Sequence, residues 1–341
     1  FKYFMILLNN INDELNSIFP KEIIDEFLFP LETYSLFMER LSINPSIFFK
    51  KWSEREKQNF TNKYWNKNTK SDWNWSLSFP FFTLLEKYVS SIDHPIIVGF
   101  SGLPGSGKST LGFWINSLAR DLSLDIKVIS LDDFYLPSKQ MDIAMNGNPW
   151  NVPRGFPGSH SIELLNQSLD NFLNTGFIKY PTFDKSLREG KGDRSGWLEI
   201  KTKVLILEGW FVGCEPITNL TEIDYFSEDK FNLCLSQIEK EFRSSIQKSL
   251  ILYGQIWKKF YKVWHLKATK FNNTILWKTQ QEKEMINLKG SGLKDKKLTD
   301  FIRMIQASIP QGSLLSINSD TTIEINHNRR IYNLYTNPYS F

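Results

Sequence analysis

The sequence predicts an α/β fold, in which a doubly wound parallel sheet follows a helical accessory region. Three observations predict it. Short continuous apolar runs alternate with helical stretches along residues 91–341, as expected of parallel strands covered on both faces. A glycine-rich segment stands between the first run and the helix after it. Residues 1–90 show helical periodicity and no strand alternation.

Four apolar runs are the candidate strands of this sheet. They cover residues 96–100, 126–131, 204–207 and the stretch around 263–266. Asp132 and Glu208 directly follow the second and third runs. Because the ligands of such a sheet bind at the carboxyl ends of its strands, both carboxylates are expected at that edge.

The accessory region is predicted over residues 1–90, with a second domain over 91–341. Ile23, Ile24 and Phe27 share a helical face before Pro30 interrupts it. Residues 61–78 carry tryptophans among asparagines and lysines without a clear period, which predicts a long surface loop. The apolar residues 3–8 are too few for a membrane span and predict a buried helical turn.

Composition limits the classes of function. With 341 residues, 41% of them hydrophobic, the chain can fill a substantial core. Its 41 basic and 37 acidic residues give a formal charge of +4 spread along the chain, which argues against a nucleic-acid partner. Cys214 and Cys234 form no C-x-x-C pair and the four histidines lack zinc-ligand spacing, so we expect a reducing, cytoplasmic setting and no structural metal. No membrane partner is indicated, and the oligomeric state stays open.

The glycine-rich segment matches the Walker A pattern, Gly-x-x-x-x-Gly-Lys-Ser, between a predicted strand and a predicted helix that runs from Lys108 to about Leu122. This context predicts a phosphate-binding loop and narrows the fold to the P-loop NTPase type. Backbone N–H groups and Lys108 are expected to bind phosphates and Ser109 to bind Mg²⁺, so the predicted cofactors are ATP and Mg²⁺. Thr110 stands where a dinucleotide-binding motif needs its third glycine, which excludes that motif. The predicted nucleotide-binding residues are Gly102, Leu103, Pro104, Gly105, Ser106, Gly107, Lys108, Ser109 and Thr110.

Two carboxylates fit the requirements of phosphate transfer to an alcohol, which needs a proton acceptor at the attacking hydroxyl and an acidic group near the metal. Asp132, first in an Asp-Asp-Phe-Tyr segment, is the predicted base. Glu208 occupies the Walker B position and is expected to act in catalysis with Lys108 and Asp132, and as a metal ligand with Ser109. Asp133 is predicted to be a further metal ligand, or else a cap of the turn that follows.

Cations cluster in the loops between these strands. Arg and Lys side chains that face the strand ends can hold an anionic substrate, and Arg is well suited to grip a carboxylate. These loops therefore predict a substrate site. Its candidate residues are Arg154, His160, Lys185, Arg188 and Arg194.

These motifs together are specific, and they extend over about residues 95–310. They lie at residues 99–111, 132–136, 147–149, 154–160, 183–186, 192–194 and 207–214. In them the chain resembles the D-glycerate 3-kinase family of plants, cyanobacteria and fungi, which is related in fold to uridine kinase, phosphoribulokinase and pantothenate kinase. It departs from the family pattern at Ser161, at Lys278 and over residues 292–295.

The resemblance implies transfer of the γ-phosphate of ATP to the 3-hydroxyl of D-glycerate, a small-molecule partner, to give 3-phosphoglycerate in photorespiratory carbon recovery. It also implies that Asp132 is the catalytic base. Two alternatives stay open. One is a kinase of another small hydroxylated metabolite, such as a nucleoside or pantothenate, and the other is a P-loop ATPase that transfers phosphate only to water.

Overall fold

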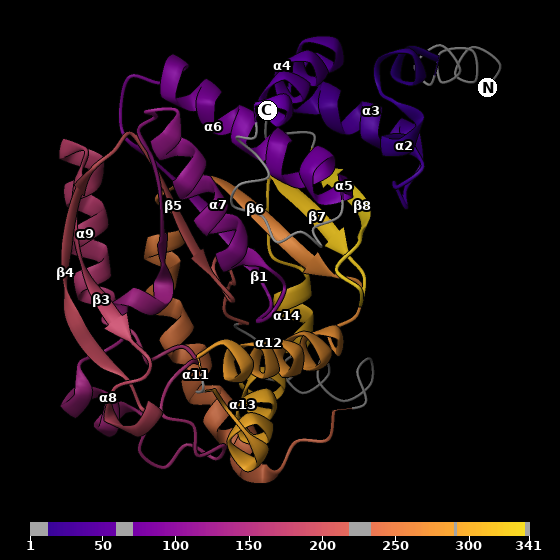
Figure 1. Ribbon diagram of the computed structural model, residues 1–341. Helices are drawn as coiled ribbons and strands as arrows, with labels where there is room; N and C mark the ends of the chain where they lie inside the picture. The colour runs from indigo at the N-terminus through magenta and orange to yellow at the C-terminus, as the bar shows by residue number, and fades with distance from the viewer. Residues whose placement is uncertain (1–12, 59–70, 218–232, 290–291, 338–341) are drawn as a thin grey trace.

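The computed structural model of the protein describes residues 13–58, 71–217, 233–289 and 292–337, and its central feature is a six-stranded sheet (Figure 1). The strand order is β2-β5-β1-β6-β7-β8. All neighbouring pairs are parallel except β7 and β8, so the antiparallel strand lies at one edge. The strands are β1 (Ile96–Gly102), β2 (Ile126–Ser130), β5 (Val204–Gly209), β6 (Phe260–Ala268), β7 (Thr321–Ile325) and β8 (Ile331–Thr336).

The predicted α/β class with a mostly parallel sheet is confirmed. The four apolar runs became β1, β2, β5 and β6, which are consecutive neighbours in the sheet, with β2 as one edge strand. Every residue of β1 and β5 is buried, which explains why these strands read as continuous apolar runs. No continuous apolar run predicted β7 and β8, because buried residues in these strands are interrupted by more exposed ones.

Helices and one hairpin complete the domain around the sheet. Helix α7 follows the glycine-rich segment and packs on β1, β2 and β5. The hairpin of β3 and β4 forms a separate two-stranded sheet beside α9. These elements are α7 (Lys108–Asp121), the 3₁₀ turn η2 (Leu131–Phe134), α8 (Ser138–Ala144), α9 (Ile162–Thr175), β3 (Phe177–Asp184), the 3₁₀ turn η3 (Arg188–Gly190), β4 (Asp193–Lys201), α11 (Gln237–Trp257), α12 (Asn273–Lys289), α13 (Asp295–Ser308) and α14 (Gln311–Leu315).

The described residues before β1 are helical, and their buried side chains join the same hydrophobic core as the sheet. Asn44 shows how one of these helices begins: its side chain accepts a hydrogen bond of 3.0 Å from the Ile47 N–H, and Pro45 follows at the first helical position. The elements are α2 (Lys21–Ile24), α3 (Leu31–Arg40), α4 (Pro45–Lys57), α5 (Ser71–Trp73), the π-helical turn η1 (Asn74–Ser78) and α6 (Phe79–Ser91). The division of the chain at residue 90 stays a prediction.

The predicted surface loop over residues 61–78 is wrong for its described part, residues 71–78. That part is helical, and Trp73 and Trp75 are buried. The segment lacked a period of 3.6 because η1 is a π-helical turn with all five residues buried, so no polar face marks its period. Residues 61–70, and the turn predicted at residues 3–8, lie outside the described residues. None of the described helices combines the length and apolar character needed to cross a membrane.

Candidate active site

The glycine-rich segment connects β1 to α7, as the Walker A pattern predicted. Gly107 has a left-handed backbone, with φ +109°, and directly precedes the first helical residue, Lys108. The Lys108 side chain curls over the loop, where its Nζ donates to Leu103 O at 3.2 Å. Burial lowers the pKa of Lys108, against the opposing effect of the nearby Glu208 and Asp132 carboxylates. The loop thus places one buried cation and a helix N-terminus at the carboxyl end of β1.

Helix α12 supports this loop from outside, a feature that the sequence analysis missed. Thr274 donates from Oγ1 to Pro104 O at 2.9 Å. Trp277 lies so close to Gly105 that a Cβ there would approach its backbone to 2.7 Å. Figure 1 shows α12 lying across the end of β1, beyond the edge of the sheet. No local pattern in the sequence could connect a helix near residue 277 with a loop near residue 105.

Asp132 lies in the η2 turn and forms an ion pair with Lys185, which follows β3. The Lys185 Nζ is 2.6 Å from Asp132 Oδ2. Burial by itself raises the pKa of Asp132, but Lys185, His160 and a hydrogen bond with Tyr135 outweigh it and hold that pKa below its usual range. Asp132 is therefore ionised near neutral pH. The structure brings together two residues that the sequence analysis had assigned to different roles, base and substrate site.

Asp133 caps the same turn. Its Oδ2 accepts from the Ser130 N–H at 3.2 Å, and the Ser130 hydroxyl accepts from the Asp132 N–H, which completes a capping box. Burial raises the pKa of Asp133 to about 6, with smaller contributions from the Asp132 and Glu208 charges. The capping alternative is thus present in the structure, while metal binding by Asp133 stays a prediction.

Glu208 is the penultimate residue of β5 and lies beside the start of α7. Its Oε1 accepts from the Ser109 hydroxyl at 3.1 Å, although the two residues are far apart in sequence. Glu208 is buried and Ser109 is exposed, so the pair opens toward solvent at the loop. A hydroxyl beside a carboxylate suits Mg²⁺, which in phosphotransferases takes one or two protein oxygens and fills its shell with phosphates and water. The described residues contain no group of three or more His, Cys, Asp or Glu side chains that could hold a metal ion by themselves. Phosphate and water oxygens would therefore have to complete the metal's coordination shell.

Two of the predicted substrate arginines lie near Tyr135 and Lys185. Arg154 donates to the carbonyl oxygens of Gly190 and Lys191 at 2.8 and 2.6 Å, and its charge affects the pKa of Tyr135 and Lys185. Arg194 donates from Nε to Tyr135 O at 3.2 Å. Its buried NH2 group has no hydrogen-bond partner within the described structure. Arg194 therefore keeps one donor group for a ligand.

Arg188 and His160 have other surroundings. Arg188 pairs with Asp142 of α8 at 2.5 Å, and this carboxylate is about half exposed. His160 is buried, stacks on Tyr135 with 4.5 Å between ring centroids, and contacts the Tyr253 hydroxyl through Nδ1 at 2.8 Å. Burial lowers the pKa of His160 to about 4, so the ring is neutral at pH 7. The substrate roles of Arg188 and His160 stay predictions.

Lys278 of α12 adds a cation to the site. In the sequence this residue stands out only as a departure from the family pattern. It forms a buried ion pair with Glu282, one helical turn further on, at 2.5 Å. Its charge affects the pKa of Lys108, and the charges of Lys185 and Asp132 affect the pKa of Lys278 itself. Lys108, Lys185 and Lys278 therefore surround the edge where Asp132 and Glu208 lie.

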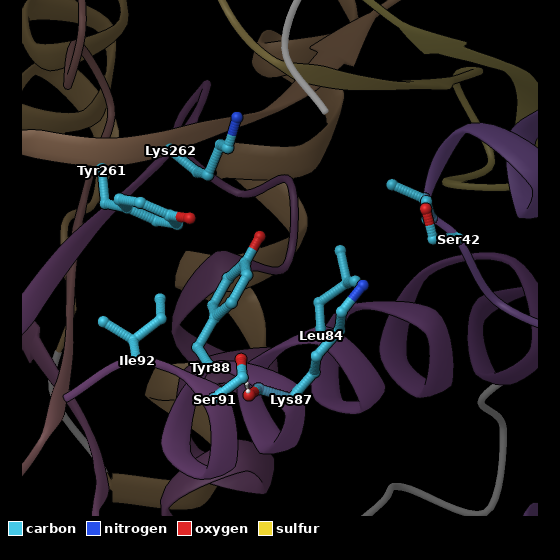
Figure 2. Close-up of a pocket in the computed structure, with 9 residues that line it drawn as sticks. Ser42, Leu84, Lys87, Tyr88, Ser91, Ile92, Tyr261 and Lys262 are labelled. Carbon is cyan, nitrogen blue, oxygen red and sulfur yellow. Dashed lines mark hydrogen bonds between the residues drawn. The ribbon is translucent and has the colours of Figure 1, made fainter.

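A cavity of about 280 Å³ lies elsewhere, between α3, α6 and the beginning of β6 (Figure 2). In the close-up, Tyr88 of α6 points toward the gap between Tyr261 and Lys262. Those two residues lie near the start of β6, whereas the phosphate loop follows the end of β1, and the two strands are parallel. The cavity is thus at the opposite edge of the sheet from the candidate active site.

Comparison with known proteins agrees with this geometry. No family model matches the chain. It is 31% identical over 229 residues to the uncharacterized kinase mug58 of Schizosaccharomyces pombe, a match that covers 64% of this chain and 81% of mug58. It is 29% identical over 221 residues to the chloroplastic D-glycerate 3-kinase of Arabidopsis thaliana, covering 61% of this chain and 45% of that protein.

A solved structure of D-glycerate 3-kinase from Cryptococcus neoformans superimposes with a TM-score of 0.63 at 25% identity, covering 75% of this chain and 97% of that one. The fold, the Walker A loop and these relatives define an ATP-dependent P-loop kinase. More particularly, the chain belongs to the D-glycerate 3-kinase family.

Proposed function

We propose that this kinase transfers the γ-phosphate of ATP to the 3-hydroxyl of D-glycerate and releases 3-phosphoglycerate. The observation that carries the proposal is the Asp132–Lys185 ion pair, which lies at the strand edge beside the phosphate loop and close to Arg154. A carboxylate surrounded by cations suits a substrate that carries both a hydroxyl and a carboxylate group. The same proposal includes a role for this reaction in photorespiratory carbon recovery.

ATP is held, in this proposal, by the loop at residues 102–110. Its backbone N–H groups and the N-terminus of α7 bind phosphate oxygens, and Lys108 reaches the phosphoryl group to be transferred. Ser109 Oγ and Glu208 Oε1, which lie 3.1 Å apart, would hold Mg²⁺ together with the nucleotide, and the bound ion would supply positive charge beside the phosphates.

Asp132 is the residue that orients the substrate hydroxyl and accepts its proton. A pKa below the usual range makes Asp132 a weak base in the ground state. This suits a loose phosphoryl-transfer transition state, in which catalysis rests mainly on positioning and charge stabilisation and the proton moves late. Lys185 already pairs with Asp132, and its positive charge can also attract the carboxylate of the incoming glycerate.

Arg194 and Arg154 grip that carboxylate. Arg194 offers its free NH2 group, and Arg154 is held near Lys185 by two backbone carbonyls of the β3–β4 connection. Bidentate arginine contacts distinguish a carboxylate from a neutral hydroxyl by charge and by shape.

ADP release in a coupled assay tests the proposal. The panel contains D-glycerate, glycerol, a nucleoside, pantothenate and no acceptor. Strict dependence on D-glycerate supports the proposal. Preference for the nucleoside or pantothenate would identify that compound, in place of D-glycerate, as the substrate. Equal turnover without any acceptor would indicate an ATPase.

Arg194→Ala tests the carboxylate grip within the same assay. Loss of one partner of a buried charge-assisted contact costs about 2–5 kcal/mol, so kcat/KM for glycerate should fall about thirtyfold or more, while KM for ATP changes little. Arg55→Ala is the control, because Arg55 of α4 pairs with Glu86 of α6 at 2.7 Å and is not among the predicted substrate residues. An unchanged preference for glycerate over glycerol in Arg194→Ala would contradict the grip.

A further inference from the structure

Two adjacent arginines in the turn between β7 and β8 connect different parts of the molecule. Arg329 reaches the phosphate loop, where its Nε donates to Gly105 O at 2.8 Å. Its remaining nitrogens donate to Gln280 Oε1 at 2.8 Å and to Trp277 O at 3.3 Å, both on α12. One guanidinium therefore ties the loop to the helix that lies against it.

Arg330 points instead to the N-terminal helices. Its Nε donates to Asp72 Oδ2 at 2.8 Å, and its NH2 group donates to Glu26 O. The same Asp72 oxygen accepts from the Ile331 N–H at 3.0 Å. Asp72 is fully buried, and a buried carboxylate without its partners is costly, so this junction has one favourable arrangement.

Trp73 joins the two networks. Its indole Nε1 donates to Arg329 O, which holds the backbone of the residue that reaches the loop. Its ring also lies against Gly107, where a Cβ would approach the Trp73 Cη2 atom to 2.8 Å. Helix α5 thus contacts the β7–β8 turn and the phosphate loop at once, and Figure 1 shows α5 beside β8.

These contacts bear on phosphate binding through the direction of the loop's peptide groups. In a trans peptide the C=O and N–H groups point in opposite directions, and the described chain has no cis bonds. Thr274 fixes Pro104 O and Arg329 fixes Gly105 O, both from outside the loop. The Gly105 N–H group is consequently turned toward the inner side, where an anion can bind. The Ser106 N–H, whose direction Arg329 fixes, donates to Leu103 O at 3.1 Å, the carbonyl that also accepts from Lys108.

We propose that Arg329 is a positioning residue for the phosphate loop, and that Asp72 and Trp73 of the N-terminal helical region hold Arg329 in place. The helical region then belongs to the nucleotide-binding apparatus. This inference rests on the proposed binding of ATP phosphates by residues 102–110, and it is independent of which acceptor is phosphorylated.

Direct measurement of ATP affinity by titration calorimetry, with thermal unfolding in parallel, tests the inference. Arg329→Ala should raise the Kd for ATP about tenfold or more, because the loop loses the charge-assisted hydrogen bond that holds Gly105 O. Arg329→Lys keeps a single donor and should give an intermediate Kd. Asp72→Asn preserves size, and Trp73→Phe keeps an aromatic ring but removes the indole N–H that holds Arg329 O. Both should weaken ATP binding severalfold without contacting the nucleotide.

Arg40→Ala is the matched control. Arg40 donates to Thr336 O at 2.8 Å and so joins the same helical region to the same strand β8, but away from the loop. It should lower the melting temperature and leave the Kd for ATP unchanged. Equal loss of ATP affinity in Arg40→Ala would show general loosening and overturn the inference.

Two further results would also overturn the inference. One is an ATP affinity within twofold of wild type in both Arg329→Lys and Trp73→Phe, which are the variants most certain to fold. The other is a wild-type protein that binds no ATP, because the loop assignment would then fail as well. If wild type binds ATP but ignores glycerate, only the acceptor proposal fails and the calorimetric test still decides this one.

Discussion

Gly105→Ala tests how closely α12 lies against the phosphate loop. Gly105 has φ +77°, and a left-handed backbone costs a residue with a Cβ roughly 1–2 kcal/mol. The new Cβ would also lie 2.7 Å from the Trp277 carbonyl carbon and 2.9 Å from the Lys278 nitrogen. These are backbone atoms of a helix and cannot turn aside as a flexible side chain can. The loop itself must therefore shift.

Gly147→Ala measures the cost of a left-handed backbone alone, and so separates that cost from the effect of the clash between the loop and α12. Gly147 has nearly the same φ, +72°, but a Cβ there would meet no atom within 4 Å. Overpacking costs about 1–3 kcal/mol, so the Kd for ATP should rise about 5- to 150-fold in Gly105→Ala. Gly147→Ala should lose only stability. Calorimetric ATP titration of both variants, with melting curves, measures this difference, and wild-type affinity in a folded Gly105→Ala protein would refute the close contact.

Three further predictions concern charge. The Lys108→Ala protein should fold, and its kcat should be lower by about a hundredfold or more, because a positioned cation on the transferred phosphoryl group supplies several kcal/mol of transition-state stabilisation. Steady-state kinetics on the folded variant checks this, and near-normal turnover would contradict it. Asp132→Asn should lower kcat by roughly two to four orders of magnitude with little change in KM for ATP, whereas Asp133→Asn should do less, and the reverse order would make Asp133 the base. Burial lowers the pKa of His160 to about 4 and that of His265 to about 3, so below pH 6.5 the unfolded chain binds more protons than the folded one. The free energy of unfolding should therefore be highest above pH 6.5 and fall by about 2 kcal/mol per histidine by pH 5, with an opposing gain from Asp133. Urea titrations at both pH values measure this fall, and His265→Gln should make it smaller.

Much of the site could be predicted because its signals are local or follow from a simple rule of topology. The phosphate loop is contiguous, and its glycines and Lys108 carry their chemistry in fixed spacing. Asp132 and Glu208 follow apolar runs, and parallel strands bring their carboxyl ends to one edge. The Ser109–Glu208 contact of 3.1 Å is the physical result of that rule.

The pairing of charges was not predictable in the same way. The sequence placed Arg188 and Arg194 together as substrate residues because they are neighbours in one cationic stretch. In the structure Arg188 pairs with Asp142 of α8, whereas Arg194 donates to the Tyr135 carbonyl, and each also has one buried nitrogen without a hydrogen-bond partner in the described residues. Composition shows which charges are available, but the direction of each side chain depends on the backbone turn that carries it.

By itself, then, the sequence determined the α/β class, the phosphate loop and the two carboxylates at the strand ends. Only the tertiary structure decided what supports them: Thr274, Trp277 and Arg329 around the loop, Lys278 beside Asp132, and Trp73 against Gly107. The reason is physical. Hydrophobic periodicity reports which face of an element is buried, whereas a hydrogen bond between Arg329 and Gly105 requires two distant segments to meet within 2.8 Å, and no local pattern encodes that meeting.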